Sequence, residues 1–353
     1  MIKNVVLLTS NFPFGKGEEF LETELDYLIN GFDKLVIIAS NRKDNKTREI
    51  PSGVLYLRFE KYAPAFFSKT SFTAFFQELK YIKKRKLLNK RVVRLVIVYF
   101  INASIKARKI EKTLKKQNLN FENTIIYSYW ANNNLLAALF LKSKFPNLKI
   151  ITRAHGGDLY LERHIDHYIP FRKFIYDYID NIFTISEQGK SYLQLHYPNL
   201  FPSQISVSRL GVKKINNSNV NFNNLSKKDE LFIVSCSYLS PVKRIDLLIK
   251  ELSLITDIKI KWRHIGGGIL LEEMKKLADH LIGSKENIDY SFLGHKKNNE
   301  VYQFYSDNDI DIFISVSESE GIPVSFMEAQ LFGIPIFQII RVILASIYLL
   351  LKM

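Results

Sequence analysis

Short apolar runs alternate with amphipathic stretches along most of the chain. The runs typical of strands are Val5–Thr9, Leu35–Ala39, Val54–Leu57, Thr124–Tyr127, Lys149–Thr152, Ile182–Ser186, Ile205–Ser208, Leu231–Ser235, Ile258–Ile265 and Ile310–Val316. Between them lie helical patterns such as Glu18–Ile29 and Leu135–Lys144, whose apolar residues fall on one side. Strands that alternate with helices need crossover connections, so we predict an α/β protein with parallel sheets covered by helices on both faces.

A polar stretch interrupts this alternation once. Residues 216–228 are mostly Asn, Ser and Lys, which predicts a linker. A length of 353 residues fits two domains, so we predict one over residues 1–215 and another over 229–336. Residues 337–353 form an atypical apolar tail, in which Arg341 and Lys352 enclose an uncharged stretch shorter than the ~20 residues of a membrane span.

Positive charge is concentrated in one segment. The chain carries a net charge of +15, and between Lys80 and Lys116 fourteen Lys and Arg stand against the single acid Glu111. Three interpretations are open: a solvated helix surface, adsorption to an anionic bilayer, or nucleic-acid binding. No recognition motif or aromatic stacking series accompanies the charge, so we predict an anionic membrane surface as the partner and no nucleic acid.

The cysteine, the clustered histidines and the first residues of the chain exclude several classes of protein. Cys236 is the only cysteine, which excludes an intramolecular disulfide framework. His164, Asp166 and His167 match no zinc spacing, so we expect no metal site. The first residues lack the layout of a secretion signal, which favours a cytoplasmic protein, peripheral on the inner face of the cell membrane.

Polar residues and glycines follow several of the predicted strands. Gly15 and Gly17 come after the first strand and lead into a helix, and His155 with two glycines follows Lys149–Thr152. Open parallel sheets bind ligands beyond the carboxyl ends of their strands, and a helix start there favours an anion. These residues are therefore candidate ligand contacts in the first domain.

The second domain repeats this arrangement with stronger signals. The candidates are Lys243 and Arg244 after Leu231–Ser235, the glycines Gly266, Gly267 and Gly268 after Ile258–Ile265, and Glu320 and Glu328 after Ile310–Val316. Pro323 suits the first position of a helix and Gly333 its end. Amides near Val324 and Ser325 would then face a phosphate, and carboxylates would accept hydrogen bonds from sugar hydroxyls.

The run from Glu320 to Ala329, followed by Gly333-Ile334-Pro335, resembles the paired-glutamate signature of family 4 retaining glycosyltransferases. That family has the GT-B fold, in which two Rossmann-like domains face a cleft. The resemblance implies that Glu320 lies beside the donor sugar, that Glu328 holds the nucleotide ribose, and that Lys243 neutralises the donor diphosphate.

The resemblance assigns the remaining candidates as well. It implies that His155 lies next to the transferred sugar, that Gly15 and Gly17 belong to a loop near the phosphates, and that Gly266–Gly268 adjoins the nucleotide. Where the family has an arginine five residues before the lysine, this chain has Tyr238, so we expect Arg244 to supply the second cation.

The implied activity is transfer of a sugar, with retained configuration, from a nucleotide-diphosphate sugar to a hydroxyl of a glycan or lipid-linked acceptor. It would be a hexosyltransferase of surface polysaccharide or lipopolysaccharide biosynthesis, without a bound cofactor or metal. After Ile336 the chain departs from the family pattern, which indicates a truncated or frame-shifted end and an incomplete second domain. The alternatives are a catalytically inactive remnant that binds a membrane or a partner, and an epimerase with the same fold.

Overall fold

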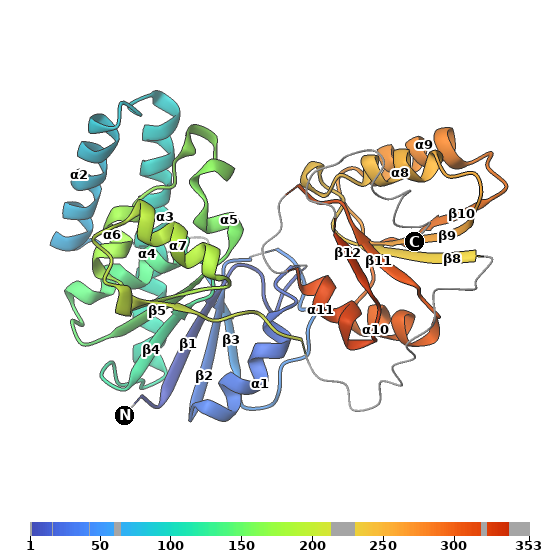
Figure 1. The fold of residues 1–353 in the computed structure, drawn as a ribbon. Coiled ribbons are helices and arrows are strands. Elements are labelled where there is room, and N and C mark those ends of the chain that lie inside the picture. The colour runs from blue at the N-terminus through green and yellow to red at the C-terminus, as the bar shows by residue number, and fades with distance from the viewer. Residues whose placement is uncertain are drawn as a thin grey trace. The chain divides into compact units, whose positions relative to one another are not determined.

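The computed structural model describes residues 2–15, 17–41, 43–59, 65–212, 230–318 and 323–338. The chain forms two compact units, Met1–Leu210 and Gly211–Met353 (Figure 1). The predicted linker at 216–228 and the tail from residue 339 lie outside the described residues.

The first unit is a seven-stranded sheet in the order β3-β2-β1-β4-β5-β6-β7, with every neighbouring pair parallel. Its strands are β1 (Asn4–Thr9), β2 (Lys34–Ala39), β3 (Leu55–Arg58), β4 (Thr124–Ser128), β5 (Lys149–Ala154), β6 (Asn181–Thr184) and β7 (Ile205–Val207). Its helices of seven or more residues are α1 (Leu21–Gly31), α2 (Lys69–Lys84), α3 (Lys90–Lys116), α4 (Asn133–Phe140), α6 (Arg172–Tyr178) and α7 (Glu187–His196). A one-turn helix, α5 (Gly156–Leu159), follows β5.

The second unit is a five-stranded parallel sheet in the order β10-β9-β8-β11-β12. Its strands are β8 (Glu230–Cys236), β9 (Lys259–Ile265), β10 (Ile288–Phe292), β11 (Ile312–Ser315) and β12 (Ile336–Gln338). Its helices are α8 (Ile245–Ser253), α9 (Leu271–Ile282), α10 (Asn298–Asp307) and α11 (Val324–Leu331).

Each sheet buries both of its faces. In the first unit Val6 and Leu8 pack into a core with residues of α3 and α4, whereas Val5 and Leu7 pack against α1. In the second unit Ile312 and Ile314 of β11 pack in the core beneath α8 and α9, whereas Phe313 between them packs in the core beneath α10 and α11. Because side chains alternate along a strand, a continuous apolar run is what such a doubly covered strand requires. The predicted pair of α/β units is confirmed.

The structure differs from the sequence-based expectation at several element ends. Strands β10 and β12 were not expected. The helix expected from Glu18 begins at Leu21, since Glu18 has a φ of 62°. Pro323 has extended backbone and precedes α11 rather than starting it, while Gly333 ends that segment with a φ of 71°.

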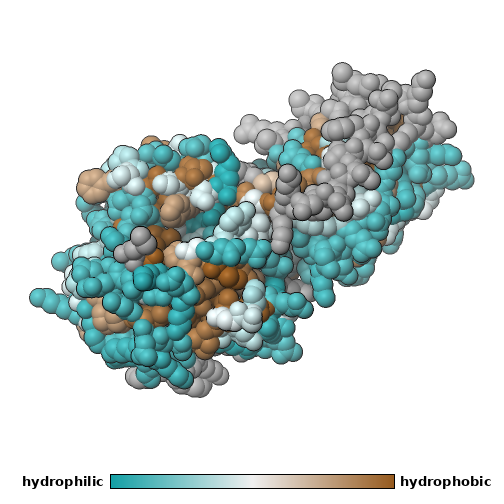
Figure 2. Space-filling model, turned by 90° about the horizontal axis from the view of Figure 1, so that it is seen from below, coloured by the Kyte–Doolittle hydropathy of each residue, from teal (hydrophilic) through white to brown (hydrophobic). Residues whose placement is uncertain are grey.

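Seen from below, the surface of the first unit carries apolar patches among hydrophilic residues (Figure 2). No helix of the described part of the chain is long and apolar enough to cross a membrane.

Candidate functional site

The strand order of the second unit reverses between β8 and β11, and the loops after these two strands meet. The amide of Glu318, after β11, donates to the carbonyl of Val242, after β8, at 3.0 Å. Lys243, the next residue, is half-buried at the end of a short 3-10 helix (Pro241–Lys243). In an open parallel sheet this switch point is where ligands bind, because the connections on either side diverge there.

Lys243 and Glu328 both act electrostatically on one thiol at the end of β8. Burial raises the pKa of Cys236 to about 12, the carboxylate of Glu328 raises it as well, and the ammonium of Lys243 lowers it. Both side chains therefore lie within electrostatic range of that thiol. The direct link between the two loops is the hydrogen bond from the amide of Glu318 to the carbonyl of Val242.

Glu328 is enclosed within the second unit. It lies inside α11 with 8% of its surface exposed and accepts a hydrogen bond from the side-chain amide of Asn298, at the start of α10. Burial raises the pKa of the nearby Tyr302 to about 12, and the charge of Glu328 adds to that shift. A buried carboxylate with a fixed orientation suits hydrogen bonds from a diol.

Arg244, expected to supply a second diphosphate cation, is engaged elsewhere. Its guanidinium is 3.2 Å from Asp246 and 2.5 Å from Glu318. Its backbone is left-handed, with a φ of 50°, directly before α8. Contact with a diphosphate would compete with these two carboxylates.

Two of the three glycines after β9 are required because backbone of the loop after β8 lies too close to leave room for a Cβ. A Cβ on Gly266, where φ is 143°, would lie 1.9 Å from the carbonyl oxygen of Ser237, and one on Gly268 would lie 2.3 Å from that of Leu239. The loop after β8 therefore packs directly on the loop after β9. Gly267 has ordinary space for a Cβ, with its nearest neighbour, His295, at 3.7 Å.

Glu320 lies outside the described residues, as do Gly321 and Ile322. The described chain resumes at Pro323, and the amides of Val324 and Ser325 belong to the first turn of α11.

The corresponding switch point of the first unit, between β1 and β4, contains one of the protein's own carboxylates. Glu18 is 4% exposed and accepts hydrogen bonds from the amides of Ser10, Asn11 and Phe12 at 2.9, 2.7 and 2.6 Å. The indole N–H of Trp130, after β4, donates to the same carboxylate. The amides that would receive an anion here are thus occupied by Glu18, a role with no signal in the sequence.

Gly15 and Gly17 lie beside this carboxylate and are held by one arginine. The carbonyls of Gly15 and Gly17 accept from Arg48, while the amide of Gly17 donates to Glu19 at 2.8 Å. The amide of Gly15 donates to the carbonyl of Asn45 at 3.1 Å. Both amides are engaged with protein groups in this structure, and the expectation that this loop lies near the donor phosphates stays a prediction.

Glu18→Gln is expected to lower the free energy of unfolding by about 3 kcal/mol, because a neutral amide replaces a buried charged acceptor of several amides. Urea unfolding of the purified chain measures the change. Glu49→Gln, at an exposed position, is the control and should change it by less than about 0.5 kcal/mol. An unchanged midpoint in Glu18→Gln would show that the carboxylate is dispensable.

His155 follows β5 as expected and is enclosed by aromatic rings. Its ring lies 4.3 Å from that of Trp130, 5.1 Å from Tyr129 and 5.6 Å from Phe20, between ring centroids. Among the described residues neither ring nitrogen has a hydrogen-bond partner, although both are buried. Buried polar atoms without a protein partner point to a ligand or water that completes them.

The backbone around His155 is fixed by Asp158, which the sequence analysis did not single out. Its carboxylate accepts from the amide of His155 at 2.6 Å and from that of Ala131 at 2.5 Å. The buried Arg172 donates to the backbone carbonyl of Asp158. The spacing of three between His155 and Asp158, at the start of a helical turn, was a readable capping signal.

His155 is expected to remain neutral well below its ordinary pKa. Burial, and secondarily the charge of Arg153, lower its pKa to about 3. In imidazole ¹⁵N spectra, the signal that disappears in His155→Gln should not titrate between pH 8 and about 4.5. A midpoint near 6.5 would contradict the buried environment.

The same shift has a defined sign for stability. The unfolded chain binds this proton below about pH 6.5, whereas the folded chain does not until about pH 3, so His155 makes the free energy of unfolding fall as the pH is lowered through that window. Asp158 acts in the opposite direction. Burial raises the pKa of Asp158 from 3.8 to about 6, so the folded chain binds this proton at a higher pH than the unfolded chain does. Asp158 therefore makes the free energy of unfolding rise as the pH is lowered from about 6 to about 4. The spectroscopic titration separates the two groups.

Among the described residues, no group of three or more His, Cys, Asp or Glu side chains could hold a metal ion. His164 instead contacts the carbonyl of Gly157, at 2.8 Å, and Asp166 lies 3.9 Å from Arg91.

Solved structures similar to this chain share its fold over most of its length. The lipopolysaccharide outer core galactosyltransferase WaaB is 15% identical, with a TM-score of 0.61, over 95% of this chain and 80% of that one. Anabaena HepE in complex with UDP and glucose is 14% identical, with a TM-score of 0.61, over 96% and 80%. S. aureus TarM in complex with UDP and α-GlcNAc-glycerol is 13% identical, with a TM-score of 0.60, over 96% and 85%. These likenesses confirm the GT-B type of α/β fold.

A search of curated protein sequences returned no match. Residues 217–339 match the family model described as glycosyl transferases group 1. This range lies within the second unit and includes Lys243, the Gly266–Gly268 turn, Glu320 and Glu328. The family match and the shared fold together support a glycosyltransferase of the GT-B fold.

Proposed function

We propose that this chain is a retaining hexosyltransferase of family 4, which moves a sugar from a nucleotide-diphosphate sugar to a hydroxyl of a glycan or lipid-linked acceptor. The observation that supports it most is the contact between the loops after β8 and β11 at the switch point of the second unit, with Lys243 next to that contact and the buried Glu328 in the helix that follows β11. A cation and a buried carboxylate at that place match the two ends of a nucleotide diphosphate, since one complements phosphate charge and the other accepts from the ribose.

In the proposed reaction the bond between the anomeric carbon and the diphosphate oxygen breaks. The diphosphate leaves with the bonding electrons, the acceptor oxygen forms the new bond to the anomeric carbon, and the proton of the acceptor hydroxyl passes to the departing diphosphate oxygen. Lys243 opposes the charge that develops on the diphosphate, together with the first-turn amides of α11. Glu320, by the resemblance, lies beside the donor sugar.

His155 is proposed to contact the transferred sugar. A neutral imidazole can donate one hydrogen bond and accept another, and its two buried nitrogens lack protein partners among the described residues. The rings of Phe20 and Trp130 beside it are partly exposed and offer apolar faces to the carbon side of a pyranose.

The acceptor is proposed to belong to surface polysaccharide or lipopolysaccharide biosynthesis, reached by peripheral attachment to an anionic membrane through Lys80–Lys116. WaaB is a lipopolysaccharide galactosyltransferase and HepE and TarM bind UDP, so UDP-sugars are the first donors to try.

The test is release of nucleoside diphosphate from UDP-, GDP- and ADP-sugars by the purified chain, with and without glycan and lipid-linked acceptors. At least one donor should be consumed in an acceptor-dependent way, and Glu328→Gln should lower that turnover by about tenfold or more. Glu272→Gln, on the exposed side of α9, is the control that should leave it unchanged. Conversion of the donor sugar into an epimer, with no net release of nucleoside diphosphate and no acceptor, would point to an epimerase. Equal turnover in Glu328→Gln would remove this carboxylate from the mechanism.

A further inference from the structure

Helices α2 and α3 form a hairpin on the outside of the first unit (Figure 1). The exposed large apolar side chains of the described residues are concentrated on it: eight of the 18 lie between residues 67 and 101. They are Phe67, Phe72 and Phe76 on α2 and before it, Leu88 in the turn, and Leu95, Ile97, Val98 and Ile101 on α3. We call these eight residues the apolar face of the hairpin.

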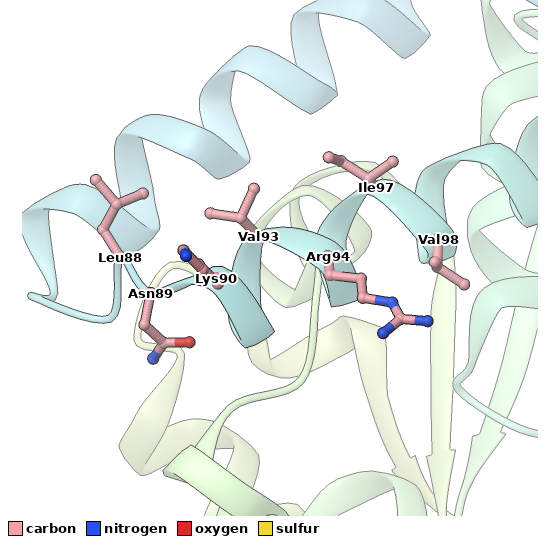
Figure 3. Close-up of a pocket in the computed structure, with 7 residues that line it drawn as sticks. All are labelled: Leu88, Asn89, Lys90, Val93, Arg94, Ile97 and Val98. Carbon is pink, nitrogen blue, oxygen red and sulfur yellow. The ribbon is translucent and has the colours of Figure 1, made fainter.

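The apolar face contains a cluster of rings and an open hollow. Phe67 and Phe72 stack on each other at 5.4 Å, and their rings lie 6.0 and 6.2 Å from that of Phe100 of α3. At the start of α3, an open hollow of about 700 Å³ is lined by Leu88, Asn89, Lys90, Val93, Arg94, Ile97 and Val98 (Figure 3). Apolar patches of this kind on a protein surface mark an interaction with a partner or a membrane.

The charges around the apolar face are of one sign. Exposed cations surround it at Lys80, Lys83, Lys84, Arg85, Lys86, Lys90, Arg91 and Arg94. The only acid between residues 65 and 101 is Glu78, which is 3% exposed and accepts from the hydroxyl of Tyr168. The surface of this segment therefore presents apolar and cationic groups together.

In the far half of the basic segment, some of the charges are used internally. Lys106 is buried and donates to Asn133 and Asn134 at 2.7 and 2.6 Å. Although burial opposes ionisation of Glu111, hydrogen bonds from Lys144 and Lys115 hold its pKa below the usual value. Lys112 and Lys116 remain exposed in the far half, but the exposed cations are most numerous next to the apolar face.

The cations at the start of α3 also oppose the helix dipole. The first turn of α3 holds Lys90 and Arg91 and no acid, at the end where a helix favours negative charge. Only the side chain of Asn89 caps this end, by accepting from the amide of Val92 at 2.9 Å. A phosphate group brought to this turn would interact favourably with both the cations and the dipole.

We propose that the apolar face of the hairpin inserts among the acyl chains of an anionic bilayer while Lys80–Arg94 contact the lipid phosphates. This inference rests on the peripheral attachment proposed above and specifies its partner as acyl chains together with headgroups. Charge complementarity selects the bilayer over a second copy of this chain, whose hairpin would carry the same positive charge. Binding by charge alone is screened by salt, whereas binding that includes insertion keeps a salt-resistant part.

The experiment is co-flotation of the full chain with vesicles of phosphatidylcholine, with and without about one third phosphatidylglycerol, at about 0.1 and 0.5 M salt. The chain should bind the anionic vesicles, bind the neutral vesicles more weakly, and retain part of its anionic binding at the higher salt. The triple variant Phe72→Ser/Phe76→Ser/Ile97→Ser should lose about tenfold or more of the binding at high salt. The matched control is Tyr27→Ser/Leu195→Ser/Ile269→Ser, three exposed apolar residues outside the hairpin, which should bind as the wild type does.

The outcomes separate the two levels of the proposal. Binding that disappears at the higher salt and is equal in both triple variants would overturn insertion and leave attachment by charge. No binding to anionic vesicles at low salt would overturn both, without bearing on turnover of a soluble donor and acceptor. Self-association of the wild type without vesicles, lost in the hairpin variant, would assign the face to a second copy instead.

Discussion

Lys243→Ala should lower kcat/KM for the nucleotide-sugar donor by about 10²–10³-fold. In the proposed mechanism this ammonium opposes the charge that grows on the departing diphosphate, and loss of one such group from an enclosed site has an effect of this size. The loss should appear mainly in kcat, because the diphosphate gains charge only as its bond to the sugar breaks. Lys243→Arg should restore part of the activity, since it keeps the charge but changes the geometry.

The control for this experiment is Lys275→Ala. Lys275 lies on α9 of the same unit and pairs with Glu272 at the surface, so its loss removes the same charge away from the switch point. Thermal unfolding of each variant shows whether the chain remains folded. If Lys243→Ala turns over as fast as the wild type, the assignment of Lys243 to the donor diphosphate is wrong.

Gly266→Ala should destabilise the second unit by about 4 kcal/mol, near the upper end for a single substitution. The added Cβ would lie 1.9 Å from the carbonyl oxygen of Ser237, and the φ of 143° is one that side chains rarely adopt. The carbonyl belongs to the backbone, so relief requires the loop after β8 to move away from the loop after β9. Because that loop continues to Lys243, donor binding should weaken as well.

Gly267→Ala is the matched control, with its nearest neighbour at 3.7 Å, and should change stability by less than about 1 kcal/mol. Urea unfolding followed by Trp262 fluorescence reports on the second unit, since Trp262 is buried in its core, and Trp130→Phe removes the other tryptophan. Equal midpoints for Gly266→Ala and Gly267→Ala would contradict the close packing of the two loops.

The central strands could be predicted from the sequence because helices cover both of their faces. Runs such as Val5–Thr9 and Leu231–Ser235 are apolar at successive positions, as burial on both faces requires. Strand β10, Ile288–Phe292, has Asp289 and Ser291 between its apolar residues and lies at an edge of the sheet, so its pattern was weaker. Strand β12 is only three residues long.

Part of the candidate site could also be predicted from the sequence. Lys243 and Glu328 follow β8 and β11, which pair in the sheet, so topology alone predicts that both lie beyond the same edge. The hydrogen bonds from the loop amides to Glu18 could not be predicted. They depend on the left-handed backbone of Glu18 and on Trp130, which is 112 positions away in the sequence. The engagement of Arg244 with Asp246 and Glu318 likewise depends on how two loops meet.

The membrane prediction rested on charge, and the structure changes which charges are available. The segment from Lys80 to Lys116 contains the end of α2 and the whole of α3, and Asn89 starts the second helix. Lys106 and Glu111 are buried, whereas the apolar residues near Arg94 are exposed. A hydrophobic pattern gives the side of a helix that can be buried, but only the packed fold shows which apolar residues remain at the surface.

Calorimetric titration of the purified chain with UDP-, GDP- and ADP-sugars tests most directly whether the loops after β8 and β11 bind a nucleotide diphosphate. We expect saturable binding of one nucleotide series, weakened by about tenfold or more in both Lys243→Ala and Glu328→Gln. Absence of binding to every nucleotide sugar, or binding that neither substitution alters, would contradict the account and favour a chain that only attaches to a membrane or a partner.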